Sequence, residues 1–129
     1  MRILHALLVA SPLTRLELRP LLAANRTVHL AAEVADLTAA RDVLEMLKVD
    51  VVLLETSLPG EDAFELLPYI PITTRVLCLT ADSCDLMRAL TYGSLECVPL
   101  PVRAGALAAG LDNVGRGREI APLVALRYA

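Results

Sequence analysis

Residues 51–60 of this chain read Val51-Val52-Leu53-Leu54-Glu55-Thr56-Ser57-Leu58-Pro59-Gly60. Four apolar residues end in a single carboxylate, and a Pro-Gly turn follows shortly afterwards. A continuous apolar run of this length is typical of a strand that is buried on both faces of a parallel sheet. Such a strand delivers its last residue to the carboxyl edge of the sheet, where α/β folds place their ligand sites. We therefore expect Glu55 to lie at the centre of any functional site.

On either side of this stretch, apolar strands alternate with helical patterns. Strands are predicted at residues 3–9, 28–32, 51–54, 75–80 and 97–99. Helices are predicted to begin at Pro12, after Asp36, around Phe64, at Ser83 and at Val102. Five βα units of this size predict an α/β fold with a doubly wound parallel sheet and right-handed crossovers. The flavodoxin-like (βα)5 arrangement, with strand order 2-1-3-4-5, is the expected topology.

Local signals mark where these helices begin, bend and end. Ser11 and Pro12 supply an N-cap residue and a proline at the first helical position. Pro20 is expected to kink the first helix or to loosen one of its turns, and Gly93 is expected to close the helix at 83–92. Apolar spacing predicts inward-facing residues in the second and last helices. These are Leu37, Ala40, Leu44 and Leu47, and Leu107, Leu111 and Val114.

Length, charge and hydrophobicity narrow the class of protein. The 129 residues suffice for one domain with a core, and 56 % of them are hydrophobic. No uncharged apolar run approaches the roughly 18 residues of a membrane span, and the N-terminus does not resemble a signal peptide. We therefore expect a cytoplasmic protein. The net charge of −3 comes without a basic block, so this segment is not expected to bind nucleic acid.

The three cysteines, Cys78, Cys84 and Cys97, lack CxxC spacing and have no histidine at ligand spacing. Buried thiols are therefore expected in preference to a metal site. Cys78 and Cys97 fall on neighbouring predicted strands, which keeps a redox role open as an alternative.

Residues 1–115 resemble the receiver domains of bacterial response regulators, the CheY-like family, in the order and spacing of their motifs. Glu55 falls where the family has its phosphoacceptor Asp, and Thr80-Ala81 matches the family's Thr-Ala after strand four. The resemblance implies a site of five groups. Two acids after strand one and the acceptor Asp hold Mg²⁺, because this ion requires oxygen ligands. A Thr or Ser after strand four and a Lys after strand five bind the phosphoryl oxygens.

This sequence departs from that set at most positions. The two acids are replaced by Val9 and Ala10, and the Lys is replaced by Leu100. Pro101 remains, so the cis peptide common there in the family is expected. Glu55 carries its carboxylate about 1.5 Å further than Asp would, from single-bond geometry. The resemblance thus implies a degenerate phosphoacceptor site without Mg²⁺ or any other cofactor. It comprises Glu55, Val9, Ala10, Ser57, Thr80, Leu100 and Pro101.

The expected function is that of a pseudo-receiver, a non-enzymatic regulatory module of signal transduction that works without phosphorylation. It would act through a protein partner or a homodimer, using the face formed by the helix at 83–92, strand five and the last helix. Two alternatives stay open: a phosphorylatable two-component receiver with Glu55 as its acceptor, and a small flavodoxin-like enzyme or ligand-binding domain. Glu55 is also open to interpretation as a mimic of the phosphorylated state.

Residues 116–129 change in character, from Gly- and Arg-rich to apolar. This stretch resembles the linker between the receiver and the helix-turn-helix domain of NarL/FixJ-type regulators, and residues 88–93 also fit that group. We therefore expect a receiver-like domain at 1–115 and a linker at 116–129. The resemblance implies that a DNA-binding output domain follows in a longer protein.

Overall fold

The computed structural model of the chain describes residues 3–91 and 96–116, except for the side chains of Cys84 and Leu90. The described residues form an α/β domain in which five parallel strands make one sheet. The strands are β1 Leu4–Val9, β2 Val28–Val34, β3 Val51–Glu55, β4 Arg75–Thr80 and β5 Glu96–Pro99. Their order is β2-β1-β3-β4-β5, which confirms the predicted flavodoxin-like topology. The expected cap at Gly93 and the expected linker beyond residue 116 lie outside the described residues.

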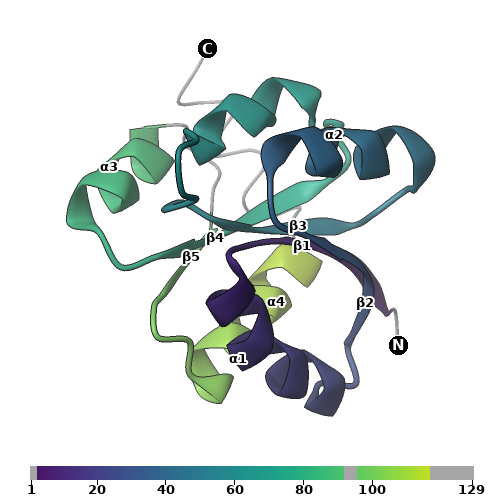
Figure 1. The fold of residues 1–129 in the computed structure, drawn as a ribbon. Helices are drawn as coiled ribbons and strands as arrows, with labels where there is room; N and C mark the ends of the chain where they lie inside the picture. Colours follow the sequence, from purple (N-terminus) through teal and green to yellow (C-terminus); the bar gives the residue numbers. More distant parts are fainter. Residues whose placement is uncertain (1–2, 92–95, 117–129) are drawn as a thin grey trace.

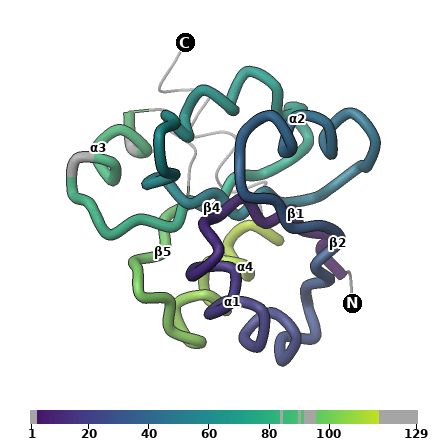
Figure 2. Tube along the Cα trace, viewed as in Figure 1, coloured from purple at the N-terminus to yellow at the C-terminus, as the bar shows by residue number. Residues whose placement is uncertain are grey.

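Helices cover both faces of this sheet (Figure 1). The helices are α1 Pro12–Ala24, α2 Leu37–Met46, the 3-10 helix η1 Ala63–Tyr69, α3 Ser83–Thr91 and α4 Ala104–Gly115. Helices α1 and α4 lie against one face, whereas α2, η1 and α3 lie against the other. This three-layer arrangement follows from right-handed crossovers that change direction after β1. The tube trace in Figure 2 shows the same layers from the same side.

The core has two halves, one on each face of the sheet. Side chains of β1 alternate between them: Leu8 packs toward α1 and α4, while Leu7 and Val9 pack toward α2 and η1. All five residues of β3 are buried, as expected for a central strand that is covered on both faces. Among the described residues, no helix is long and apolar enough to cross a membrane.

The predicted elements are confirmed, with shifts at their ends. Strand β2 continues two residues beyond the predicted 28–32, and β3 includes Glu55 as its last residue. The predicted inward position of Leu47 is wrong, because α2 ends at Met46 and Leu47 is left 44 % exposed. Helix α1 continues through Pro20 to Ala24. The inward positions of Leu107, Leu111 and Val114 in α4 are confirmed.

Charged side chains fasten α1 to the edge strand β2. Glu33 accepts hydrogen bonds from the guanidinium of Arg19, and Arg15 reaches the same carboxylate at 3.5 Å. The hydrogen bonds from Arg19 hold the pKa of Glu33 below its ordinary value. Arg15 also donates to the carbonyl oxygen of Ala10, at 3.1 Å. The loop between β1 and α1 is therefore held from the β2 side.

Candidate functional site

The predicted site residues come together at the carboxyl edge of the sheet. In the register of the parallel strands, Val9 lies beside Leu54, Glu55 beside Leu79, and Thr80 beside Pro99. The first residues after β1, β3, β4 and β5 therefore leave the sheet at one edge. This is the edge at which doubly wound folds form their ligand crevice.

Glu55 does not point into open solvent at this edge. Its side chain is only 6 % exposed, and both of its carboxylate oxygens accept hydrogen bonds. Oε1 accepts the backbone N–H of Ser11 at 2.7 Å, and Oε2 accepts the hydroxyl of Thr14 at 2.7 Å. Thr14 is also 6 % exposed. A solvated acid at a strand end, the plainest alternative for Glu55, is therefore not what the fold contains.

These two donors lie at the first turn of α1, so Glu55 caps that helix from another strand. In a capping box, an acid at the third helical position reaches back to the N–H of the N-cap residue. Here that position holds Thr14, and Glu55 supplies the carboxylate. The amino end of a helix carries partial positive charge, which stabilises an anion there. Among the described residues, Glu55 forms no ion pair, so neutral donors hold its charge.

Ser11 is the N-cap residue of α1, as predicted, but its side chain does not cap the helix. Ser11 has the extended backbone of an N-cap residue, but its side chain makes no capping hydrogen bond. Its hydroxyl instead donates to the hydroxyl of Thr14 at 3.3 Å. Ser11 contributes to the site through its backbone N–H, which Glu55 accepts.

Val9 and Ala10 occupy the positions where the resemblance places the two acids. Both are completely buried, Val9 in the half of the core under α2 and Ala10 in the half under α1. An alkyl side chain offers no ligand to a cation. Within residues 3–91 and 96–116, no group of three or more His, Cys, Asp or Glu side chains could hold a metal ion.

Thr80 lies at the end of β4, but its hydroxyl bonds within its own turn. It donates to the carbonyl oxygen of Asp82 and accepts the N–H of Asp82, both at 3.1 Å. This is the local turn that a Thr hydroxyl commonly makes with the backbone two residues on. Thr80 and Glu55 thus lie at the same edge of the sheet, but their side chains bond to different partners. The Thr80 hydroxyl bonds to Asp82, and the Glu55 carboxylate bonds to Ser11 and Thr14.

Leu100 and Pro101 follow β5. The peptide bond between them is cis, as the resemblance led us to expect. The N–H of Leu100 donates to the carbonyl oxygen of Thr80 at 3.0 Å, and its side chain packs against the core under α4. Leu100 therefore turns toward the core, at the position where the family carries its cation.

Ser57 is exposed in the turn after β3, and Gly60 completes this turn with a φ of 73°. A positive φ is accessible to glycine at little cost because it lacks a Cβ atom. Thr56 anchors the start of the turn, since its N–H donates to the carbonyl oxygen of Leu79 at 3.0 Å.

Thr14 is the site residue that the sequence analysis missed. A signal existed, because Thr14 lies three residues after the N-cap residue, where side chains reach back over the start of a helix. Its partner Glu55 lies 41 residues further along the chain. Only the pairing of β1 with β3 shows that the two meet.

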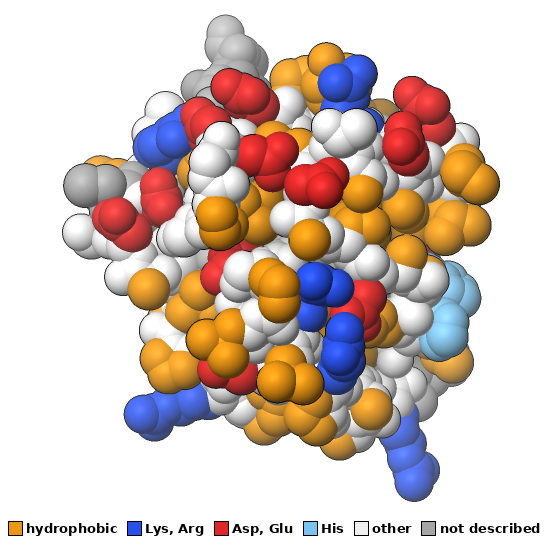
Figure 3. Space-filling view, viewed as in Figure 1, with side chains coloured by type: hydrophobic (Ala, Val, Ile, Leu, Met, Phe, Trp, Pro, Cys, Tyr) orange, Lys and Arg blue, Asp and Glu red, His pale blue; other side chains and the backbone are white. Residues whose placement is uncertain are grey.

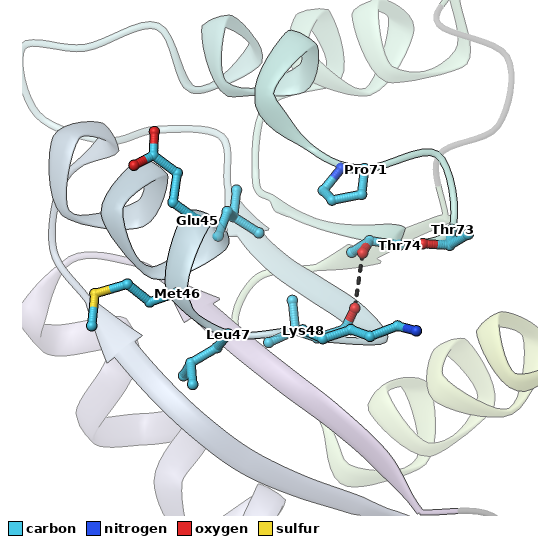
Figure 4. Close-up of a pocket in the computed structure, with 9 residues that line it drawn as sticks. Glu45, Met46, Leu47, Lys48, Pro71, Thr73 and Thr74 are labelled. Carbon is cyan, nitrogen blue, oxygen red and sulfur yellow. Dashed lines mark hydrogen bonds between the residues drawn. The ribbon is translucent and has the colours of Figure 1, made fainter.

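A separate groove of about 330 Å³ opens at the opposite, amino edge of the sheet (Figure 4). It lies between the end of α2 and the loop that leads into β4, and Glu45, Lys48, Pro71 and Thr73 are among its lining residues. Thr74 closes one wall by donating to the carbonyl oxygen of Val49 at 2.8 Å. This groove is remote from Glu55, which ends β3 at the other edge.

On the face of the molecule that Figure 3 shows, acidic and hydrophobic side chains gather over different elements. Acidic side chains gather mainly over the side of α2, η1 and α3, and hydrophobic side chains are prominent over α1 and α4. Leu13 and Leu16 of α1 are 67 % and 62 % exposed. On the other side of the sheet, Met87 of α3 is 63 % exposed.

No protein-family model matches this sequence, and no curated protein matches it. Solved structures of response regulators and of their receiver domains are similar to this chain. A LuxR-family two-component response regulator from Aurantimonas sp. SI85-9A1 superposes with a TM-score of 0.78 at 22 % identity, covering 98 % of each chain. The isolated receiver domain of RcsB from Salmonella enterica serovar Typhimurium, with the phosphomimetic BeF₃⁻, gives 0.78 at 21 % identity, covering 90 % of this chain and 91 % of the other.

The response regulator domain of Thermotoga maritima CheB gives a TM-score of 0.70 at 19 % identity and covers 92 % of this chain and 96 % of the other. The chain therefore has the fold of response-regulator receiver domains. It spans only 65 % of the RcsB chain that was solved bound to promoter rprA.

Proposed function

We propose that this chain is a pseudo-receiver: a regulatory module with the receiver fold that acts through protein contacts and does not transfer phosphoryl groups. The observation that carries the proposal is the state of Glu55. Its carboxylate is buried, and both oxygens accept hydrogen bonds from the first turn of α1. A phosphoacceptor must instead present a carboxylate oxygen to the incoming phosphorus, with a cation nearby to offset the charge that develops.

The neighbours of Glu55 support the same conclusion. Val9 and Ala10 supply no metal ligand, and Leu100 supplies no cation. The structure gives no support to Glu55 as a mimic of the phosphorylated state, because Thr80 bonds to Asp82 and not to Glu55. A non-enzymatic role is also favoured, because the Thr14 hydroxyl, which donates to Glu55, is buried and is not presented to a substrate from solvent.

Incubation with Mg²⁺ and acetyl phosphate tests the proposal. We expect no phosphoryl adduct by intact-mass spectrometry, and no change in the amide NMR spectrum when beryllofluoride and Mg²⁺ are added. A receiver domain with the complete set of acids and Lys, treated in parallel, serves as the positive control. A Mg²⁺-dependent adduct mapped to Glu55 would show that the chain is a phosphorylatable receiver.

We further propose that a second copy of this chain docks on the face formed by α3, β5 and α4. In Figure 1 these elements lie together at the β5 edge of the sheet. Helix α3 exposes Leu86 and Met87, and α4 exposes the small residue Ala109, which allows close approach of another helix. Arg88 holds α3 to η1 through Asp62 at 2.9 Å, and this contact keeps the pKa of Asp62 below its ordinary value.

Met87→Lys is expected to shift the molar mass in multi-angle light scattering from dimer toward monomer, by at least a tenfold weaker association. A charged residue that is buried in an apolar contact costs on the order of 1–3 kcal/mol. Met46→Lys is the matched control, because Met46 is 82 % exposed on α2, away from this face. A wild-type chain that stays monomeric at all concentrations, or an equal effect of both substitutions, would rule out this interface.

The linker resemblance of residues 116–129 supports a third proposal, that this module precedes a DNA-binding output domain in a longer regulator. RcsB, which shares the fold, was solved on promoter DNA. The reading frame beyond residue 129 tests this directly, because a helix-turn-helix domain should be encoded there.

A further inference from the structure

Two cysteines lie side by side in the sheet, away from the edge occupied by Glu55. Cys78 of β4 is paired directly with Cys97 of β5 in the parallel register. Residues paired in this way point to the same face, and both side chains belong to the half of the core under α2, η1 and α3. The interaction between the two thiols is the first cause of the pKa shift of each, and they are not joined in a disulfide.

The spacing of paired strands suits a disulfide. Adjacent strands lie about 4.8 Å apart, and disulfides join residues whose Cα atoms are about 4.4–6.8 Å apart. We propose that Cys78 and Cys97 form a redox pair, which a hydroperoxide oxidises to an intramolecular disulfide between β4 and β5. This inference does not depend on the proposed pseudo-receiver function.

The two thiols differ in ways that set their order of reaction. Cys97 is partly exposed on the edge strand β5, whereas Cys78 is fully buried. The interaction with Cys78 lowers the pKa of Cys97, and the same interaction together with burial raises the pKa of Cys78. Because the thiolate is the reactive form, an oxidant meets Cys97 first. Cys78 then acts as the resolving thiol.

The reaction balances with one hydroperoxide. The Cys97 thiolate attacks a peroxide oxygen of hydrogen peroxide and the O–O bond breaks, which leaves a sulfenic acid and hydroxide. The hydroxide takes up the proton released by the Cys97 thiol and becomes water. The Cys78 sulfur then attacks the sulfenic sulfur, the S–O bond breaks, and the departing hydroxide takes the Cys78 proton. Two thiols lose two electrons and two protons, and the peroxide becomes two molecules of water.

The test is to treat the whole chain with hydrogen peroxide and then to count the thiols that react with maleimide in denaturant. Two of the three thiols should be lost in the wild type, and dithiothreitol should restore them. Cys84→Ser is the matched variant: it should lose both of its thiols. Cys97→Ser should keep both of its thiols, because it lacks the thiol that the peroxide oxidises first. Cys78→Ala lacks the resolving thiol, so it should form no disulfide, and dimedone should trap a sulfenic acid on Cys97. Either variant tests the pair if the other one fails to fold.

Peptide mapping identifies the bond. Cys78 and Cys84 lie between Arg75 and Arg88, so trypsin leaves them on one peptide. A second digestion before Asp82 separates them. A bond from Cys78 to Cys97 supports the proposal. A bond from Cys84 to either cysteine, a bond between two chains, or oxidation to sulfinic acid without loss of a thiol pair would overturn it.

Discussion

Replacing Glu55 with alanine is expected to lower the free energy of unfolding by about 3 kcal/mol, or the melting temperature by about 10 °C. The carboxylate accepts two hydrogen bonds at 2.7 Å in a site that is 6 % exposed. Its removal leaves the N–H of Ser11 and the hydroxyl of Thr14 without their acceptor, and takes a negative charge from the amino end of α1. Urea unfolding followed by circular dichroism measures the change.

Two further substitutions separate the effect of the two hydrogen bonds to Glu55 from the effect of its negative charge. Glu55→Asp keeps the charge but is about 1.5 Å shorter, so it should lose one of the two contacts and about half of the effect. Glu17→Ala is the matched control, because Glu17 is an exposed acid on α1 that makes no contact with the site, and it should change stability little. If Glu55→Ala were no more destabilising than Glu17→Ala, the capping role would be wrong.

Gly110→Val is expected to lower the free energy of unfolding by about 2–3 kcal/mol, the usual cost of overpacking a core. Helix α4 lies so close to the sheet at Gly110 that an added Cβ atom would come within 3.0 Å of Leu77 Cδ1 and Val98 Cγ2. A branched side chain there must push the helix away from β4 and β5. The measurement is again urea unfolding.

Gly105→Val provides the matched control on the same helix. A Cβ atom at Gly105 meets nothing within 4 Å, and glycine is the poorer helix former by a few tenths of a kcal/mol. This variant should therefore be neutral or slightly more stable than the wild type. Equal losses of stability at positions 110 and 105 would show that the close packing at Gly110 is not the cause of the loss.

Most of the fold was predictable because the hydrophobic patterns along the chain matched the residues that are buried in the core. The apolar run at residues 51–54 and the βα alternation indicated a parallel sheet, and chirality rules then left one natural strand order. Errors arose at element ends. Leu47 continued the helical spacing of Leu37 and Leu44, but α2 ends at Met46 and leaves Leu47 44 % exposed. Periodicity carries no information about where a helix stops.

The candidate site was predictable in its location but not in its bonding. The sequence placed Glu55, Thr80 and Leu100 at one edge of the sheet, because each lies at the end of a parallel strand or directly after it. It could not show that Glu55 turns toward the start of α1, since this depends on the distance between β3 and the loop after β1. It also could not show that Thr80 bonds to Asp82.

The sequence by itself therefore determined the sheet, the carboxylate at its edge and the loss of the groups that would surround a phosphoacceptor. These are matters of residue type and spacing along the chain. The tertiary structure decided what Glu55 does in their absence. With Val9 and Ala10 buried, the partners that reach its carboxylate are the donors at the first turn of α1. A buried charge requires such partners, and only the packing of the helix against the sheet supplies them.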